Sequence, residues 1–255
     1  MLLSMKISIV TVTFNSAKTI RDTIESVLSQ NYPDIEYIVV DGASKDGTLD
    51  IIKEYGNKIA KVISDPDKGL YDAMNKGIRA ATGEIVGIIN SDDFYHRKDA
   101  ISIIANTFEN IETESVFADV RYVNADNLNK TVRYYSSKHF SPKCFRYGFM
   151  PAHPTFFTYK KYYDLYGYYK TYYYIAGDFE LLARFLYTNR LKYKYLPIDL
   201  MKMRTGGRSD SSIRNKIILN KEDVRACAEN GIYTNFFIIL IRYFVKIFEW
   251  IFIKK

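Results

Sequence analysis

Continuous apolar runs alternate with helix-spaced apolar positions along the first 95 residues of the chain. Such runs are typical of strands buried on both faces, and they cover residues 6–13, 35–40, 60–64 and 84–90. Between them, apolar side chains recur every three or four positions, which predicts helices over residues 19–29, 48–55 and 70–81. The alternation predicts an α/β fold with a parallel sheet, whose binding crevice lies at the carboxyl ends of the strands.

The pattern after residue 95 is less regular. It predicts a helix over residues 100–108 and strands over residues 115–123 and 132–135. Residues 121–200 hold 16 of the 23 tyrosines. These rings either pack in the interior or form a surface that stacks on sugars or meets lipid.

The last apolar segment, residues 232–253, is long enough to cross a bilayer, but its polar residues argue against a crossing. On a helix these residues lie within about 60° of one another, and they are Asn235, Arg242, Lys246 and Glu249. A narrow polar stripe beside a broad apolar face fits a helix in the membrane interface. Packing on the domain and pairing in a homodimer are the alternatives.

Charge is divided unevenly along the chain. Residues 1–120 carry 12 Lys and Arg against 19 Asp and Glu, whereas residues 121–255 carry 24 against 10. The basic half predicts an anionic partner, such as a phospholipid surface or a phosphorylated substrate, and no recognition motif supports nucleic acid. Cys144 and Cys227 match no metal or disulfide spacing, and the N-terminus lacks a secretory signal. We therefore expect a cytoplasmic protein with reduced thiols.

Three acidic sites stand where a parallel sheet and its helices would bring them to the crevice. Asp41 ends the second predicted strand. Asp92 and Asp93 follow the most apolar strand, and adjacent carboxylates favour a divalent cation shared with substrate phosphates. Asp178 begins a helical segment, where the helix dipole stabilises an ionised carboxylate that can act as a general base. Taken singly, ordinary turns and helix caps explain these residues equally well.

Four segments occur in a fixed order within residues 6–190, and they are SIVTVTFNSAKTIRDTIESVLSQNYPDIEYIVVDGASKDGT, DKGLYDAMNKGIRAATGEIVGIINSDD, HPTFF and AGDFELLARF. Together they resemble the family-2 glycosyltransferases with a GT-A fold, especially bacterial enzymes that build surface polysaccharides. The resemblance implies a Rossmann-like, mostly parallel sheet flanked by helices. It implies a glycosyltransferase domain over residues 1–220, with a nucleotide-sugar half in residues 1–120 and an acceptor half in residues 121–220. An amphipathic helical tail follows in residues 221–255.

The same resemblance assigns donor-binding roles to Val12, Phe14, Asp41, Lys68, Asp92, Arg204 and Arg208. Val12 and Phe14 match positions that line the nucleotide base, and Asp41 matches the acid that recognises it. Lys68 lies within a residue of a basic position that contacts the nucleotide. The two arginines belong to a Gly-rich loop that closes over the donor in similar enzymes and holds its diphosphate, although a surface turn also explains that loop.

Metal binding and base catalysis are assigned in the same way. Asp93 matches the last carboxylate of the Asp-x-Asp motif, which binds Mg²⁺ or Mn²⁺ at the donor diphosphate, and Asp92 would face the ribose. Ser91 replaces the first Asp of that motif, which leaves one clear metal ligand. Asp178 matches the catalytic base, with Glu180 as the alternative.

The resemblance implies an inverting glycosyltransferase in which Asp178 deprotonates an acceptor hydroxyl that displaces the nucleoside diphosphate. The expected donor is a UDP-sugar, and the expected acceptor is a polyprenyl-diphosphate-linked glycan at the inner membrane face, reached through residues 232–253. His153 either contacts the acceptor or a phosphate, or is structural. The alternative function is a non-catalytic member that binds a nucleotide sugar or acts as a scaffold. A sugar nucleotidyltransferase would need a Gly-rich phosphate loop after the first strand, where residues 14–17 contain no glycine.

Overall fold

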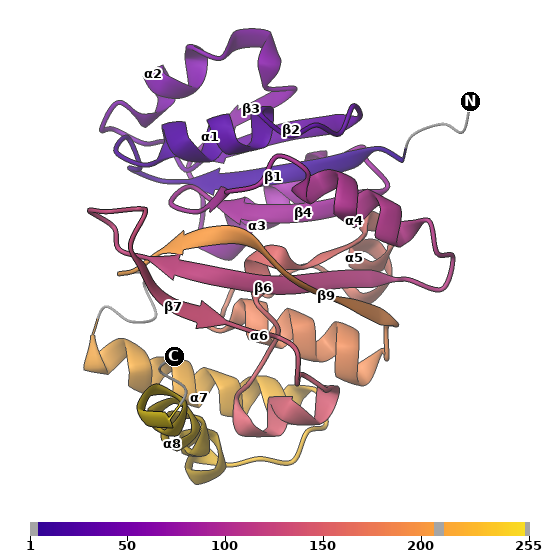
Figure 1. Cartoon of the computed structure of the whole chain (residues 1–255), viewed down its shortest axis with the longest axis vertical. Coiled ribbons are helices and arrows are strands. Elements are labelled where there is room, and N and C mark those ends of the chain that lie inside the picture. Colours follow the sequence, from indigo (N-terminus) through magenta and orange to yellow (C-terminus); the bar gives the residue numbers. More distant parts are fainter. Residues whose placement is uncertain (1–4, 207–211, 253–255) are drawn as a thin grey trace.

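The computed structural model describes residues 5–206 and 212–252. A single mixed sheet runs through the molecule in the order β3-β2-β1-β4-β8-β6-β9-β5, with β7 paired to β6 (Figure 1). The strands are β1 (Ile7–Thr13), β2 (Ile35–Asp41), β3 (Lys61–Ser64), β4 (Ile85–Asn90), β5 (Phe94–Tyr95), β6 (Ser115–Val123), β7 (Thr131–Tyr135), β8 (Phe157–Tyr159) and β9 (Tyr193–Arg204).

Helices cover both faces of the sheet. They are α1 (Ile20–Leu28), α2 (Thr48–Lys53), α3 (Leu70–Ala80), α4 (Ala100–Phe108), α5 (Lys160–Tyr166), α6 (Gly177–Ala183), α7 (Ile213–Glu229) and α8 (Phe236–Phe252). One apolar layer packs α1, α2 and α4 against the sheet, and the other packs α3, α5, α6 and α7 against the opposite face. Every helix and strand expected before residue 136 is present, with ends that differ by at most two residues.

The α/β fold is therefore confirmed, and the two halves of its sheet differ. Strands β1 to β4 pair in parallel, whereas β8 pairs antiparallel with both β4 and β6. At the first of these junctions Gly87 lies opposite Phe157, and a Cβ on Gly87 would stand 2.1 Å from the Phe157 ring. Glycine is required there because the aromatic ring occupies the space of its side chain.

The C-terminal part is the helix pair α7 and α8, which lies beyond α6 at one end of the molecule (Figure 1). Helix α7 runs through the expected domain boundary at residue 220, so no break in the chain separates the tail from the domain there. No helix in the described parts of the chain combines the length and the apolarity that a bilayer crossing needs.

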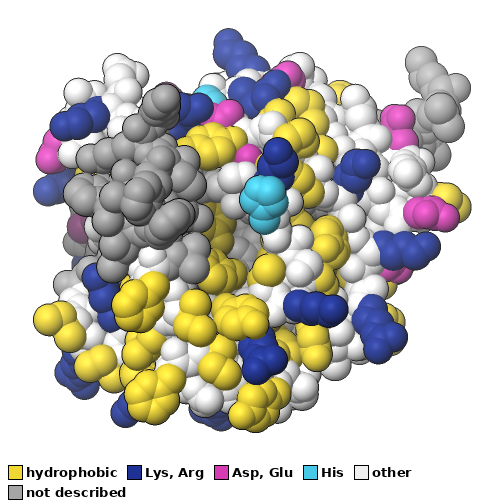
Figure 2. Space-filling model, turned by 60° about the horizontal axis from the view of Figure 1, so that its bottom comes forward, with side chains coloured by type: hydrophobic (Ala, Val, Ile, Leu, Met, Phe, Trp, Pro, Cys, Tyr) yellow, Lys and Arg dark blue, Asp and Glu magenta, His cyan; other side chains and the backbone are white. Residues whose placement is uncertain are grey.

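Helix α8 turns part of its polar side toward the domain and leaves apolar residues outside. Arg242 is only 5% exposed because it packs on α7, whereas Phe237 is 80% and Phe244 72% exposed. Figure 2 shows that apolar side chains gather on this end of the molecule, with Lys and Arg side chains among them. The polar stripe inferred from the sequence thus packs against the domain at Arg242. The side chains of Lys246 and Glu249, which belong to the same stripe, lie outside the described residues.

Candidate active site

A cavity of about 1120 Å³ opens where β1 and β4 end. Its lining includes the segment that follows β4, here called the near wall, and residues of α6, α7 and α8, here called the far wall. The expectation of a crevice at the carboxyl ends of the parallel strands is therefore met. Of the predicted site residues, Val12, Phe14, Asp92, Asp93, His153, Asp178 and Arg204 line it.

Three residues predicted to bind the nucleotide base lie at this edge of the sheet in different ways. Val12 is buried in the cavity wall, and Phe14 is 62% exposed just beyond the end of β1. Asp41 is fully buried behind the wall, where its carboxylate accepts hydrogen bonds from Ser44 and from Ser64 Oγ at 2.8 Å. Asp41 therefore shapes the turn after β2, and Gly42 takes its place in the lining.

The other two predicted donor-binding side chains lie apart from this lining. Lys68 is exposed and lines a smaller neighbouring cavity of about 310 Å³, which it shares with Tyr71 and Tyr172. Arg208 lies outside the described residues.

The turn after β4 is held by hydrogen bonds from two neighbouring segments. The Asp93 amide donates to the Asn90 carbonyl at 3.1 Å, and Thr23 Oγ1 of α1 donates to the Asp93 carbonyl at 2.7 Å. Ser91, which replaces the first acid of the motif, shares a 2.8 Å hydrogen bond with Ser16 Oγ. These hydrogen bonds fix the backbone that carries the Asp93 side chain.

Burial disfavours the ionised forms of the two carboxyl groups on this turn. Burial and the neighbouring Asp92 carboxylate hold the pKa of Asp93 well above its usual range, and burial also raises the pKa of Asp92. A cation or additional donors would stabilise the ionised pair. The site therefore favours a positively charged ligand when both carboxylates are ionised.

The oxygen atoms on this turn fit a hard divalent cation. The buried Asn90 Oδ1 has no hydrogen-bond partner among the described residues, and it belongs to the same turn as Asp93. No cluster of three or more His, Cys, Asp or Glu side chains converges on a metal position within residues 5–206 and 212–252. Magnesium-like ions commonly take one or two protein oxygens and complete their shell with substrate phosphates and water. The residues present fit that partial ligand set.

Arg204, at the end of β9, is directed at the backbone of this turn. Its Nη1 donates to the Asp92 carbonyl at 2.5 Å, and its Nη2 pairs with the Asp22 carboxylate of α1. Its guanidinium also lies 5.0 Å from the centre of the Phe94 ring. Arg204 thus fastens the acidic turn to α1, and two of its three nitrogens are engaged by the protein.

Asp178 lines the cavity from the first turn of α6. Its Oδ1 accepts a 2.8 Å hydrogen bond from the Phe179 amide, and the Tyr71 hydroxyl lies 3.5 Å away. Burial raises the pKa of Asp178, while the neighbouring His153 opposes that rise. A carboxylate with a raised pKa accepts a proton more readily than an exposed aspartate does.

An aromatic floor supports Asp178. The Tyr71 hydroxyl donates to the Ile175 carbonyl, and the Tyr71 ring stacks on Tyr169 with centroids 5.6 Å apart. His153 Nε2 shares a 2.6 Å hydrogen bond with the Tyr169 hydroxyl, and burial lowers the pKa of His153. Sequence analysis did not single out Tyr71 or Tyr169, although Tyr71 belongs to one of the four family-like segments.

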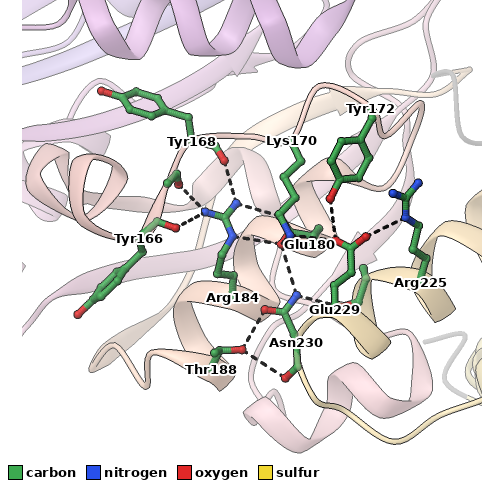
Figure 3. A network of polar contacts seen from close by, with 12 residues as sticks. Tyr166, Tyr168, Lys170, Tyr172, Glu180, Arg184, Thr188, Arg225, Glu229 and Asn230 are labelled. Carbon is green, nitrogen blue, oxygen red and sulfur yellow. Dashed lines mark hydrogen bonds and ion pairs between the residues drawn. The ribbon is translucent and has the colours of Figure 1, made fainter.

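Glu180, the alternative base, is not among the residues that line the cavity, and it lies in a network of polar contacts (Figure 3). Its fully buried carboxylate pairs with Lys170 at 2.8 Å and with Arg184 at 2.9 Å. Asn230 Nδ2 approaches the same carboxylate at 3.4 Å, and Arg184 also donates to backbone carbonyls of residues 166–168. This network joins α6 to its neighbours, and the geometry argues against Glu180 as the base.

Comparison with known proteins identifies the fold and the family. The model of the family described as glycosyl transferase family 2 matches residues 8–169. The chain belongs to this family. The family-2 chain is 38% identical over 90 residues to the putative teichuronic acid biosynthesis glycosyltransferase TuaG of Bacillus subtilis, a match that covers 34% of this chain and 36% of TuaG. It is 32% identical over 117 residues to a PGL/p-HBAD biosynthesis glycosyltransferase of Mycobacterium bovis, covering 44% and 46% of the two chains. The matches thus span less than half of either relative.

Solved structures show the same fold across most of this family-2 chain. Staphylococcus aureus TarS 1-349 in complex with UDP-GlcNAc superposes with a TM-score of 0.69 at 19% identity, covering 90% of this chain and 68% of that one. Mannosyltransferase PcManGT from Pyrobaculum calidifontis, in complex with GDP-Man and Mn²⁺, gives 0.64 at 19% identity, covering 89% and 64%. At this level of identity the likeness establishes the fold.

Proposed function

We propose that this chain is an inverting glycosyltransferase that moves a sugar from a nucleotide sugar to a hydroxyl of a lipid-linked glycan. One observation carries the proposal: Asp178 and the Asp92–Asp93 turn line the same cavity. The arrangement provides both a general base and a site for a diphosphate in one cavity. Family membership and the nucleotide-sugar complexes of TarS and PcManGT support this choice of substrate.

The donor lies along the near wall in this proposal. Val12 and Phe14 contact the base, Asp41 supports it through the turn after β2, and Asp92 faces the ribose. Lys68 approaches the nucleotide from the rim. UDP is the expected nucleotide, in line with the UDP-GlcNAc complex of TarS.

A divalent cation, Mg²⁺ or Mn²⁺, would be held by Asp93 with the Asn90 side-chain oxygen beside it. When bound, such a cation neutralises the charge of the departing diphosphate. Arg204 keeps the turn that carries Asp93 in place, and Arg208 is proposed to approach the diphosphate.

Asp178 takes the proton from the acceptor hydroxyl as that oxygen attacks the anomeric carbon. The attack comes from the face opposite the leaving group, so an α-linked donor gives a β-linked product. The aromatic floor of Tyr71 and Tyr169 holds the base, and His153 borders the same space.

The acceptor is proposed to be a polyprenyl-diphosphate-linked glycan, met at the inner face of the cell membrane. The exposed apolar residues at this end are Tyr233, Phe237, Ile241 and Phe244. An apolar helix face on a domain half with 24 basic against 10 acidic residues fits an anionic lipid surface. Pairing of two copies through this face would compete with lipid for the same side chains.

Nucleoside diphosphate release from UDP-, GDP- and dTDP-sugars, with Mn²⁺ and again with chelator, tests the proposal. We expect slow release from one donor, with at least a 100-fold loss in Asp93→Ala or with chelator, since metal stabilisation of a leaving group contributes several kcal/mol. Asp126→Ala, which changes an exposed loop carboxylate, is the control. Release from no donor, even with a membrane extract added, would contradict catalysis and favour a binding or scaffold protein.

Arg204 gives a second test, which separates positioning of the turn from charge. Both Arg204→Ala and Arg204→Lys should weaken UDP binding in the presence of Mn²⁺ by about 10-fold or more, because a lysine cannot bridge Asp22 and the Asp92 carbonyl together. Isothermal titration calorimetry measures the affinity. Wild-type affinity in Arg204→Lys would show that its positive charge, rather than its two-pronged contact, is what the donor site uses.

A further inference from the structure

The tail helices line part of the same cavity as Asp178. Helix α7 contributes Leu219 and Asp223 to the far wall, and α8 contributes Arg242 and Tyr243. A single ligand site in a protein commonly occupies about 300 to 1,000 Å³, and the whole cavity measures about 1120 Å³. The cavity is thus slightly larger than the upper end of that range.

The centre of this wall is a buried ion pair. Asp223 is fully buried and Arg242 is 5% exposed, and Arg242 Nη1 contacts Asp223 Oδ2 at 2.6 Å. The same guanidinium donates to the Gly148 carbonyl at 3.0 Å and to Asn220 Oδ1 at 2.5 Å. These contacts fix both side chains against the cavity.

Each partner nevertheless keeps one polar atom without a hydrogen bond. Asp223 Oδ1 and Arg242 Nε are buried and have no partner among the residues that the structure describes. Buried polar atoms are almost always hydrogen-bonded, so an unpaired acceptor and an unpaired donor on neighbouring cavity-lining residues call for a missing partner. The pattern points to a ligand that both donates and accepts.

A sugar hydroxyl has that property. It can donate its proton to the carboxylate oxygen and accept from the guanidinium, whereas an ionised phosphate only accepts and leaves Asp223 unsatisfied. Tyr243 and Leu219 supply the apolar surface that a sugar ring packs on. The chemistry of this wall therefore favours a neutral sugar over a phosphate group.

The wall is also close to the proposed base. Burial raises the pKa of Asp223 to about 7, Arg242 opposes that rise, and the charge of Asp178 adds to it. The charges of the two carboxylates thus interact, and both residues line the cavity.

We infer that Asp223 and Arg242 bind hydroxyl groups of the acceptor sugar and hold that sugar beside Asp178. The inference rests on the proposed glycosyltransferase function. Arg242 belongs to α8, whose opposite side is exposed and apolar. The same tail helix then contributes to the active site and to the exposed apolar face.

Asp223→Asn tests the inference most sharply, because it keeps the shape of the side chain and allows an amide NH₂ to replace an accepting oxygen. Sugar transfer to an organic-solvent extract of source membranes is measured against extract concentration, and donor hydrolysis by water is measured without extract. We expect the half-saturating extract concentration to rise at least 10-fold, with donor hydrolysis within twofold of wild type. Arg242→Lys, which keeps the charge but lacks Nε–H, should behave in the same way. Lys221→Gln, an exposed change on the same helix, is the control.

Other outcomes are distinguishable. If the ion pair is merely structural, both variants lose thermal stability and donor hydrolysis together, while the half-saturating extract concentration of the folded fraction stays unchanged. That result would overturn the inference. Unchanged half-saturation in a fully stable Asp223→Asn would overturn it as well. Absence of both transfer and hydrolysis in the wild type would instead contradict the proposed function itself.

Discussion

The Asp178→Asn variant should transfer sugar about 100- to 10,000-fold more slowly than the wild type, the range that a general base contributes. Its affinity for the donor should stay unchanged, because the donor is proposed to bind through the turn after β4, whereas Asp178 belongs to α6. Single-turnover transfer measures the rate, and calorimetry measures donor binding. Transfer at the wild-type rate would show that Asp178 is not the base.

Glu180→Gln is the matched control for that variant, since it changes a carboxylate on the same helix. Glu180 is fully buried between Lys170 and Arg184, so its loss should lower the free energy of unfolding, by about 3 to 5 kcal/mol if the two cations stay unpaired. The folded fraction should keep its transfer rate within a few-fold. A specific rate that falls as far as in Asp178→Asn would reverse the two roles.

The pH dependence of the wild type follows from the same carboxylate. A base works only when it is deprotonated, and burial raises the pKa of Asp178. Values of kcat/KM should therefore fall as the pH drops through a pKa above the usual range of an aspartate.

Replacing Phe237 and Phe244 together with serine should weaken binding to phosphatidylglycerol vesicles by about 100-fold or more, because burial of each phenyl ring contributes about 1.5–3 kcal/mol. Both rings are largely exposed on α8, at 80% and 72%. Vesicle co-sedimentation measures the partition. Donor hydrolysis in the absence of lipid should stay unchanged, since neither ring lines the cavity.

The matched control is Ile111→Ser with Leu165→Ser. These residues are 94% and 68% exposed on other elements, so the pair removes a comparable amount of apolar surface from outside the tail. Its vesicle binding should equal that of the wild type. Equal weakening of vesicle binding in both double variants would mean that α8 is not the lipid-binding face. A concentration-dependent dimer that is lost only in the α8 variant would assign this face to a second copy of the chain.

The first half of the fold is predictable because its signals are local. Strands β1 to β4 are continuous apolar runs, and the helices between them have clear periodicity, so no distant contact is needed to recognise them. Strand β8 has three residues, and its antiparallel pairing with β4 places Phe157 over Gly87. That fit depends on residues 70 positions apart, which periodicity does not report. Strand β9 contains Pro197 and irregular register shifts against β6, which weaken its pattern in the sequence.

The candidate site, too, could be predicted from the sequence only in part. Asp93 and Asp178 could be singled out because each belongs to a motif at a strand or helix end. Asp223 and Arg242 lie on different helices, and a helical stripe does not reveal which neighbour it meets. For that reason the sequence analysis placed Arg242 in the polar stripe of a membrane-facing helix, whereas the structure packs it against α7. Arg204 was likewise expected at the diphosphate, and its contacts with Asp22 became visible only in three dimensions.

The anomeric configuration of the product is the most direct test of a single displacement with Asp178 as the base. The donor identified by the release assay, labelled at its anomeric carbon, is incubated with membrane extract and wild-type protein, and the new linkage is examined by NMR. We expect an α-linked donor to yield a β-linked sugar on the lipid. Asp178→Asn should form at most about one-hundredth as much of this product in the same time. An α-linked product would contradict the single displacement.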